Sequence, residues 1–375
     1  MKYYIIAGEP SGDLQGAALV SSLRMADSNA IIRCWGGELL ASEGAEVVKN
    51  YRELAFMGFV EVLKNLGTIL RNFRFAKSDI LQFSPDCLIL IDYPGFNLRM
   101  ATWAKKQGLR VYYYISPQLW AWHTSRVKIV RDCVERMFVI FPFEEDFYKK
   151  HGVEVSFIGH PLTGVIEEHV SSLDFHRKSN LPESKPIVAL LPGSRKQEVS
   201  RILGVMLKVS TLFPDYQFVV AKAASLDLAF YQPLLAGFPS VKWVENQTYD
   251  LLQNAHAALV TSGTATLETV LFRAPQVVCY KAGRISYWLA KWLVNKDLKF
   301  ISIVNLIAGK QVVEELIQHN FTVEQTANSL LKILGGKHRA EMLNGYEQVR
   351  TLLGPTNCTE TAADFIVSAL KKNLL

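Results

Sequence analysis

The sequence lacks the features that would mark a metalloprotein or a membrane-spanning protein. Its cysteines are few, odd in number and scattered, with neither a CxxC pair nor a histidine partner for a zinc site: Cys34, Cys87, Cys133, Cys279 and Cys358. No uninterrupted apolar stretch approaches the roughly 20 residues needed to cross a bilayer. We therefore predict a protein of the reducing cytoplasm that needs no metal and no cofactor, and whose membrane contact is at most peripheral.

Charge of one sign is in only modest excess. The 41 lysines and arginines outnumber the 35 aspartates and glutamates by six, which favours acidic ligands or an anionic membrane face but predicts no nucleic-acid binding. The first apolar run ends at Gly8, so we expect a β-strand there rather than a signal peptide. At 375 residues and 49% hydrophobic content, two domains with large cores are expected.

Short apolar runs alternate with helical patterns, which predicts an α/β fold. The runs lie at residues 31–37, 87–91, 111–115, 136–141, 155–158, 187–191, 218–221, 241–244, 257–260 and 276–280. The polar stretch 171–186 predicts a linker. We expect domains at 1–170 and 187–345, and C-terminal helices at 346–375 that return either to the first domain or to a partner subunit. Both domains are predicted to be Rossmann-like and to face each other across a cleft.

One polar stretch in the second half predicts a nucleotide site. It follows the apolar run 257–260 and leads into a helical pattern. Gly263 lets a ligand approach the backbone, while the hydroxyls of Ser262 and Thr264, with the N–H groups at the helix start near Ala265, suit a phosphate. Glu268 suits the hydroxyls of a ribose. A capped helix without a ligand is the alternative.

A second phosphate candidate follows the run 187–191. Gly193 and Ser194 would present N–H groups at a helix start. Arg195 could grip a diphosphate through two parallel hydrogen bonds and supply charge for a departing nucleotide. An exposed loop arginine with no ligand is the alternative.

Acidic residues follow two predicted strands of the first half. Asp92 ends the buried run 87–91, where open α/β sheets place ligands, so it is our first candidate for a general base. Glu9 and Asp13 lie in a glycine-rich turn, where two acids would repel a pyrophosphate but could bind sugar hydroxyls. The alternatives are a helix cap or loop acid for Asp92, and a turn residue and helix N-cap for the pair.

Two further side chains are candidates for ligand contact. Trp122 stands near basic residues and could line an acceptor pocket or touch a lipid interface. Asn305 is a lone amide in an apolar turn, and its partner could be the nucleotide or the neighbouring backbone.

Two basic segments, 54–81 and 284–300, carry many aromatic and aliphatic side chains. This pattern is typical of a surface that rests on lipid. A core-facing helix with a basic flank, or a subunit contact for the second segment, is the alternative. The predicted membrane or acyl-chain contacts are Phe56, Met57, Phe59, Val60, Trp288 and Trp292.

Short motifs in one order along nearly the whole chain resemble those of the lipid-A-disaccharide synthase family. They lie at residues 8–13, 57–62, 92–97, 116–122, 141–144, 159–161, 191–195, 262–268 and 305–309. The resemblance implies a GT-B glycosyltransferase that joins UDP-2,3-diacylglucosamine to 2,3-diacylglucosamine 1-phosphate and releases UDP. It also implies inversion at the anomeric carbon without a required metal, and peripheral binding to the inner leaflet of the inner membrane from the cytoplasm.

The family's chemistry needs a base for the acceptor 6-hydroxyl and donors for the departing UDP. Asp92 fits the first role, and Arg195 with the loop at 262–265 fits the second. By the same resemblance, Glu268 and Asn305 would hold ribose or uracil, and Glu9 with Asp13 would lie near the donor or acceptor sugar. The further candidates for sugar or acceptor contacts are Ser11, Asp13, Asn97 and Trp122.

The chain departs from the family at two positions. The family usually has a second acid three residues after Asp92, where this chain has Gly95, and a proline where it has Val304. Another GT-B enzyme that uses UDP-GlcNAc, of the epimerase or MurG type, and a nonenzymatic nucleotide-binding module are the rival hypotheses. The sequence leaves acyl-chain length and oligomeric state open, a homodimer included.

Overall fold

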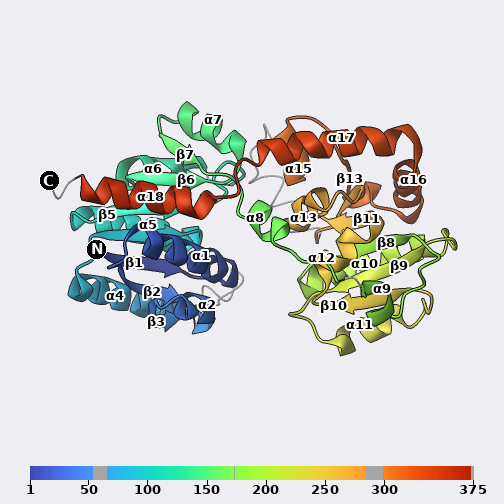
Figure 1. The fold of residues 1–375 in the computed structure, drawn as a ribbon, viewed down its shortest axis with the longest axis horizontal. Helices are drawn as coiled ribbons and strands as arrows, with labels where there is room; N and C mark the ends of the chain where they lie inside the picture. The colour runs from blue at the N-terminus through green and yellow to red at the C-terminus, as the bar shows by residue number, and fades with distance from the viewer. Residues whose placement is uncertain (54–65, 123, 173, 284–298, 373–375) are drawn as a thin grey trace. The chain divides into compact units, whose positions relative to one another are not determined.

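The computed structural model describes residues 1–53, 66–122, 124–172, 174–283 and 299–372. The chain divides into two compact units (Figure 1). The first unit is Met1–Pro161 together with Gly354–Leu375, and the second is Leu162–Leu353.

In its described part, the first unit contains a sheet of seven parallel strands in the order β3-β2-β1-β4-β5-β6-β7. The strands are β1 (Lys2–Ala7), β2 (Ile31–Gly36), β3 (Glu46–Asn50), β4 (Cys87–Ile91), β5 (Arg110–Tyr114), β6 (Arg136–Val139) and β7 (Val155–Phe157). Alternate residues of β1 enter different cores, with Tyr3 and Ile5 on one face and Tyr4 and Ile6 on the other. Because both faces are covered, the inner strands are continuous apolar runs.

Helices cover both faces of this sheet. They are α1 (Pro10–Ala26), α2 (Glu38–Ser42), α4 (Leu66–Phe83), α5 (Pro94–Lys106), α6 (Val127–Cys133), α7 (Pro142–Lys150) and α18 (Cys358–Lys371). Buried side chains of α1, α2 and α18 share one core, and those of α4, α5, α6 and α7 share the other. The sheet is therefore the middle layer of three.

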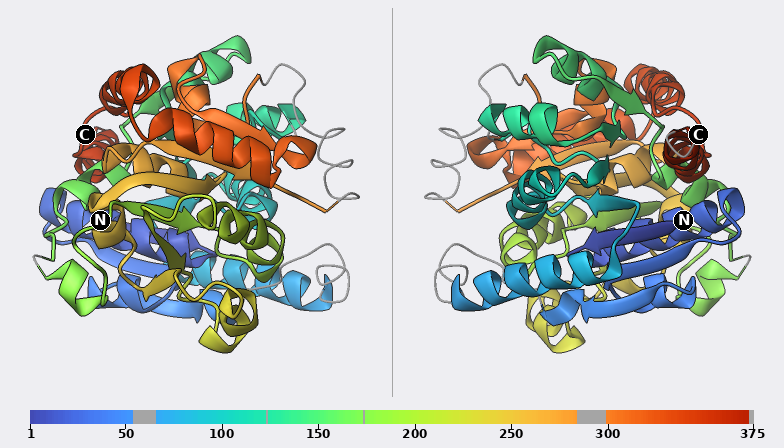
Figure 2. Two further views of the ribbon diagram at one scale, coloured as in Figure 1. Left: turned by 90° about the vertical axis from the view of Figure 1, so that its right-hand side faces the viewer. Right: turned by 90° about the vertical axis from the view of Figure 1, so that its left-hand side faces the viewer.

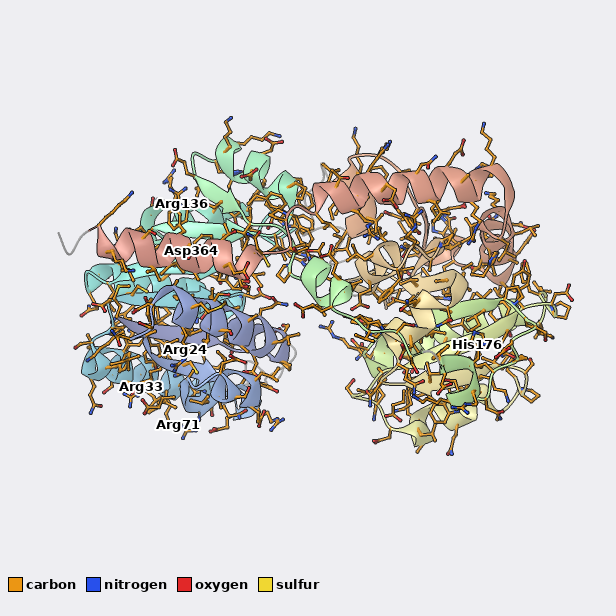
Figure 3. All side chains as sticks on the ribbon, viewed as in Figure 1. Arg24, Arg33, Arg71, Arg136, His176 and Asp364 are labelled. Carbon is orange, nitrogen blue, oxygen red and sulfur yellow. The ribbon has the colours of Figure 1, made fainter. Side chains whose placement is uncertain are left out.

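The last helix lies with the first unit. Ile366 of α18 packs in the same core as Leu19 of α1. The Arg136 guanidinium lies 5.0 Å from the centroid of the Phe365 ring, and Figure 3 shows Arg136 close to α18, which also carries Asp364. The preceding helix, α17 (Gly336–Leu352), belongs to the second unit. The C-terminal helices expected at 346–375 are thus divided between the two units.

The second unit has, among its described residues, six parallel strands in the order β10-β9-β8-β11-β12-β13. They are β8 (Ile187–Leu191), β9 (Gln217–Lys222), β10 (Lys242–Glu245), β11 (Ala255–Thr261), β12 (Gln276–Tyr280) and β13 (Glu314–Ile317). The helices besides α17 are α8 (Leu162–Glu167), α9 (Phe175–Lys178), α10 (Lys196–Ser210), α11 (Leu228–Leu235), α12 (Thr248–Gln253), α13 (Ala265–Leu271), α15 (Ile303–Ala308) and α16 (Val323–Ile333).

The predicted linker at 171–186 is wrong. Phe175 and Leu181 are buried in one core with Ile187 and Leu251, so the stretch is part of the second unit, which begins at Leu162. The polar residues and prolines of this stretch predicted a linker, because the two buried apolar residues among them give no periodic pattern. The edge strands β3 and β13 were missed because they are short and only partly buried, and therefore lack a continuous apolar run.

Candidate active site

The strand order of the first unit reverses between β1 and β4. The chain runs outward from β1 through β2 to β3 and then restarts at β4 on the other side of β1. Ala7 pairs with Ile91, so the turns that follow these strands lie side by side at the carboxyl edge of the sheet. Open α/β sheets bind ligands at such a switch point. Strand order therefore brings Glu9 and Asp92 together.

Asp92 sits in a strained and firmly held turn. Asp92 and Tyr93 have φ angles of 41° and 47°, a region that non-glycine residues rarely adopt. The Asp92 carbonyl accepts hydrogen bonds from Asn97 Nδ2 at 2.9 Å and from the Tyr113 hydroxyl. The Tyr93 ring packs against Gly8. A Cβ atom at position 8 would lie only 2.4 Å from that ring. Strain held in this way is typical of functional sites.

The environment of Asp92 makes its carboxylate more basic than usual. Burial, and then the negative charge of Glu9, raise the pKa of Asp92 to about 6, while the backbone N–H of Tyr93 opposes the rise. Glu9 itself is exposed at the start of α1 and makes no capping hydrogen bond. At neutral pH Asp92 can therefore be ionised and still accept a proton more readily than an ordinary aspartate.

Two predicted sugar ligands are structural residues instead. Asp13 is 2% exposed, and its carboxylate accepts the backbone N–H groups that begin α2, at 2.6 Å from Gly37 and 3.2 Å from both Leu39 and Leu40. Asn97 is fully buried, and its amide donates to the carbonyls at the ends of β1 and β4 and to Asp92. Neither side chain can reach a sugar, but Asn97 holds the Asp92 turn in place.

The other first-unit candidates remain accessible. Ser11 is exposed in the first turn of α1, two residues after Glu9. Trp122 is 37% exposed and follows β5, the strand beside β4. Both lie beyond strand ends at the same edge as Asp92, which is compatible with sugar or acceptor contact.

Glu144 is a residue whose importance the sequence reasoning missed. It is buried, and its Oε2 accepts the backbone N–H groups of Ile140 at 3.2 Å and Phe141 at 3.0 Å. Burial raises the pKa of Glu144 to about 8, although these N–H groups and the side chains of Ser116 and Trp120 oppose the rise. A glutamate three residues after Phe141, the N-cap residue of α7, gives only the signal of a capping box.

The strand order of the second unit also reverses, here between β8 and β11. Leu191 pairs with Val260, so the loops after these strands lie side by side at the carboxyl edge of the sheet. These loops contain the two stretches predicted to bind phosphate, 192–195 and 262–265. A second switch point thus brings together side chains from stretches about 70 residues apart in the sequence.

The first of these loops requires glycine and presents an arginine. Gly193 has a φ of +112°, and a Cβ there would lie 2.7 Å from Glu198 Oε2 and 3.4 Å from Thr261. The Arg195 side chain is 74% exposed, and its Nη1 lies 3.7 Å from Glu198 Oε1. Ser194 is exposed beside it. The guanidinium is therefore accessible to an anionic ligand.

The second loop combines an open backbone with a partly buried acid. Gly263 has a φ of +152°, and no atom lies within 4 Å of a Cβ built there. Thr264 is exposed directly before Ala265, the first residue of α13. The Ser262 hydroxyl donates to the Ile301 carbonyl at 3.4 Å. Burial raises the pKa of Glu268, and the Tyr249 side chain opposes that rise.

The predicted nucleotide contact of Asn305 is wrong. Asn305 is fully buried, and its Nδ2 donates to the Val313 carbonyl at 2.9 Å and to Glu315 Oε1 at 2.8 Å. Its Oδ1 accepts the backbone N–H groups of Val312 at 2.7 Å and Val313 at 2.9 Å. All of its hydrogen-bonding capacity is used, so the neighbouring backbone is the partner and Asn305 fixes the chain before β13.

Some predicted contacts cannot be located. Phe56, Met57, Phe59, Val60, Trp288 and Trp292 lie outside the described residues. Within the described ranges, no group of three or more histidine, cysteine or acidic side chains is placed to hold a metal ion. Among the helices that the structure describes, none combines the length and the apolar character needed to span a bilayer.

Two doubly wound parallel sheets, each with candidate ligand loops at its switch point, define the GT-B class of glycosyltransferases and UDP-sugar epimerases. The chain is similar to UDP-GlcNAc 2-epimerase from Neisseria meningitidis, with a TM-score of 0.63, 13% identity and 100% of both chains covered. It is also similar to the calicheamicin glycosyltransferase CalG4, with a TM-score of 0.61, 14% identity and 99% and 98% of the two chains covered. The predicted GT-B fold is confirmed.

Sequence relatives identify the family within this class to which the chain belongs. A family model described as lipid-A-disaccharide synthetase matches residues 3–365. The lipid-A-disaccharide synthase of Coxiella burnetii is 38% identical over 367 residues, which cover 96% of each chain. The chain belongs to the lipid-A-disaccharide synthase family and is a glycosyltransferase of lipid A biosynthesis.

Proposed function

We propose that the protein joins UDP-2,3-diacylglucosamine to 2,3-diacylglucosamine 1-phosphate and produces lipid A disaccharide 1-phosphate and UDP. The proposal rests on one observation. A chain of this family has a switch point in each of its two sheets, and each switch point presents one of the groups that the reaction needs. One switch point presents the carboxylate of Asp92, and the other presents the Arg195 guanidinium beside the open loop at Gly263. A base for the acceptor hydroxyl and a cation for the leaving group are the two groups that this transfer requires.

In the first unit, Asp92 acts on the acceptor. Its carboxylate takes the proton of the 6-hydroxyl while that oxygen forms a bond to the anomeric carbon of the donor. Attack from the face opposite the diphosphate inverts the anomeric carbon. The pKa of about 6 keeps the base ionised near neutrality and brings its proton affinity closer to the working pH. Asn97 and Tyr113 hold the turn that aims it.

In the second unit, Arg195 and the loop N–H groups act on the donor. As the bond between the anomeric carbon and the diphosphate breaks, negative charge grows on the departing UDP. The guanidinium and the N–H groups near Ser194 and Thr264 stabilise that charge. Glu268 accepts hydrogen bonds from the ribose hydroxyls, so that the diphosphate is held at the loop.

The departure at Gly95 is compatible with a mechanism that depends on Asp92 as the base. Gly95 is exposed, and no atom lies within 4 Å of a Cβ built there. The structure would accommodate a second acid at this position, yet the chain lacks one. We therefore assign proton removal to Asp92 alone, with Glu9 raising its pKa.

An assay of UDP release would test this function. With both diacylated glucosamines present we expect UDP and a disaccharide in equal amounts, because each transfer frees one nucleotide. Unacylated UDP-GlcNAc is the control donor. Turnover with it alone would favour an epimerase or a MurG-type enzyme, and UDP binding without turnover of any acylated mixture would favour a nonenzymatic module.

We also propose that the protein binds peripherally to the cytoplasmic face of the inner membrane. Helix α4 lies on the outside of the first unit (Figure 2) and shares a groove with α5. The apolar lining comes from Ile69, Leu70, Phe73 and Trp103, and the basic lining from Lys77, Arg99 and Lys106. Figure 3 shows Arg71 on the same helix. Apolar and basic groups on one surface suit anionic lipid headgroups and their acyl chains.

Replacing Leu70 with serine should weaken binding to vesicles that contain phosphatidylglycerol by roughly tenfold, the effect expected from removing one inserted leucine. Leu70 is 55% exposed and lines the groove. Leu81 is the matched control, since it is 51% exposed on the same helix but does not line the groove. Sedimentation with vesicles measures both variants. Equal binding of Leu70→Ser and the unmodified protein would reject this surface.

A further inference from the structure

A glutamate on the edge strand β13 holds the chain that leads into α15. The Oε2 atom of Glu315 accepts the backbone N–H of Ile301 at 2.9 Å. Its Oε1 atom accepts the backbone N–H of Ser302 at 2.9 Å and Asn305 Nδ2 at 2.8 Å. Ser302 is fully buried and is the N-cap residue of α15. One carboxylate thus accepts from three groups of a neighbouring segment, so the position of that segment depends on Glu315.

The segment that Glu315 holds contacts the loop that we place at the diphosphate. The Ser262 hydroxyl donates to the Ile301 carbonyl at 3.4 Å, and the backbone N–H of Ser262 donates to the Cys279 carbonyl at 3.3 Å. Ser262 is therefore held both by β12 and by the segment before α15. Ile301 joins the Glu315 carboxylate to the loop, because its N–H bonds to one and its carbonyl to the other.

Little else fixes the segment at this point. Ile301 is 38% exposed, so burial of its side chain contributes only part of the stabilisation that a core isoleucine would give. The bond between Ser262 and Ile301 is also close to the longest distance at which a hydrogen bond is effective. A small displacement of Ile301 would break it. The position of Ser262 is therefore sensitive to the hydrogen bonds that Glu315 accepts.

We propose that Glu315 is a positioning residue for UDP binding, which acts through Ile301 to hold the loop at 262–265 in the conformation that receives the diphosphate. This inference rests on the proposed function, since it requires UDP to bind at the second unit. It also predicts the sign of the effect. A negative charge near a diphosphate weakens binding by itself, so its removal alone would strengthen binding. A positioning role predicts weaker binding.

Replacing Glu315 with glutamine tests this role. Glutamine keeps the length of the side chain but has one acceptor oxygen, which can still accept from Ser302 and Asn305. Its NH2 group then faces the N–H of Ile301, which loses its acceptor. We expect the affinity for UDP to fall about tenfold, and the affinity for uridine, which has no phosphate, to change little. Isothermal titration calorimetry on the full chain measures UDP directly and uridine by competition.

The preceding residue on β13 provides a matched control. Glu314 Oε2 lies 3.5 Å from Lys332 Nζ, on α16 rather than on the segment before α15. Glu314→Gln removes the same charge one position away, and it should leave the ratio of UDP affinity to uridine affinity unchanged.

A second variant tests whether Glu315 acts through the loop. Ser262→Ala removes the hydroxyl that bonds to Ile301, so it should also lower the ratio of the two affinities. If both residues act through this one contact, adding Glu315→Gln to Ser262→Ala should have little further effect.

The outcomes separate failure of the inference from failure of the proposed function. If the unmodified protein does not bind UDP, the proposed function fails. If it binds UDP and Glu315→Gln keeps the ratio of UDP affinity to uridine affinity, the role of Glu315 is refuted while the function stands. An equal loss of both affinities, or an equal fall of the ratio in Glu314→Gln, would refute it in the same way.

Discussion

Replacing Asp92 with asparagine should reduce UDP release from the two acylated glucosamines by roughly 100-fold or more, which is the scale of a lost proton-transfer residue. Asparagine preserves the size of the side chain but cannot accept the proton of the 6-hydroxyl. The Asp92 carbonyl would still accept its hydrogen bonds from Asn97 and Tyr113, so folding should be preserved. Initial rates and a thermal unfolding curve of the same preparation measure both effects.

The pH dependence of activity gives this prediction a second readout. The base must be ionised, so kcat/KM should fall as the pH drops through about 6. Burial is the main cause of the raised pKa of Asp92 and the charge of Glu9 adds to it. Glu9→Gln should therefore shift the acidic limb to lower pH, whatever its effect on the maximal rate.

Asp146 provides the matched control. It is an exposed aspartate on α7 of the same unit, and Asp146→Asn should change neither the rate nor the pH profile. Retention of activity by Asp92→Asn would remove Asp92 from the mechanism. An acidic limb that does not move in Glu9→Gln would show that the two acids are not electrostatically coupled.

The second large effect is on stability. Glu144→Gln should stabilise the first unit increasingly as pH rises from about 4.5 to 8. Folding raises the pKa of this carboxyl from its ordinary value of 4.5 to about 8, so the folded state retains a proton that the unfolded state releases. The contribution of Glu144 to stability is complete below pH 4.5 and declines until about pH 8, by up to roughly 1.4 kcal/mol for each pH unit.

Glutamine mimics the neutral acid and can still accept the N–H groups of Ile140 and Phe141. Urea unfolding of the first unit at several pH values would measure the difference between the two proteins. Glu154→Gln is the control, since that acid is 92% exposed and should leave the pH dependence unchanged. A constant difference between Glu144→Gln and the unmodified protein across this range would contradict the buried-acid interpretation.

The sequence by itself determined the positions of the inner strands and of the acid and phosphate loops that follow them. The runs at 87–91, 187–191 and 276–280 agree with β4, β8 and β12, because a strand buried on both faces must be apolar at every position. A glycine between a strand and a helix is likewise a local signal. Family motifs then indicated the glycosyltransferase function, which the relatives support.

Only the tertiary structure decided which polar residues are available for chemistry. Asp13 and Asp92 both follow predicted strands, yet one caps α2, whose N–H groups lie 24 to 27 residues away in sequence, and the other remains at the switch point. Asn305 makes all of its side-chain hydrogen bonds to β13 and to the two residues before it, and this edge strand has no strong sequence pattern. Strand order, hydrogen-bond partners and pKa values depend on which distant segments become neighbours, and a single sequence records no such distances.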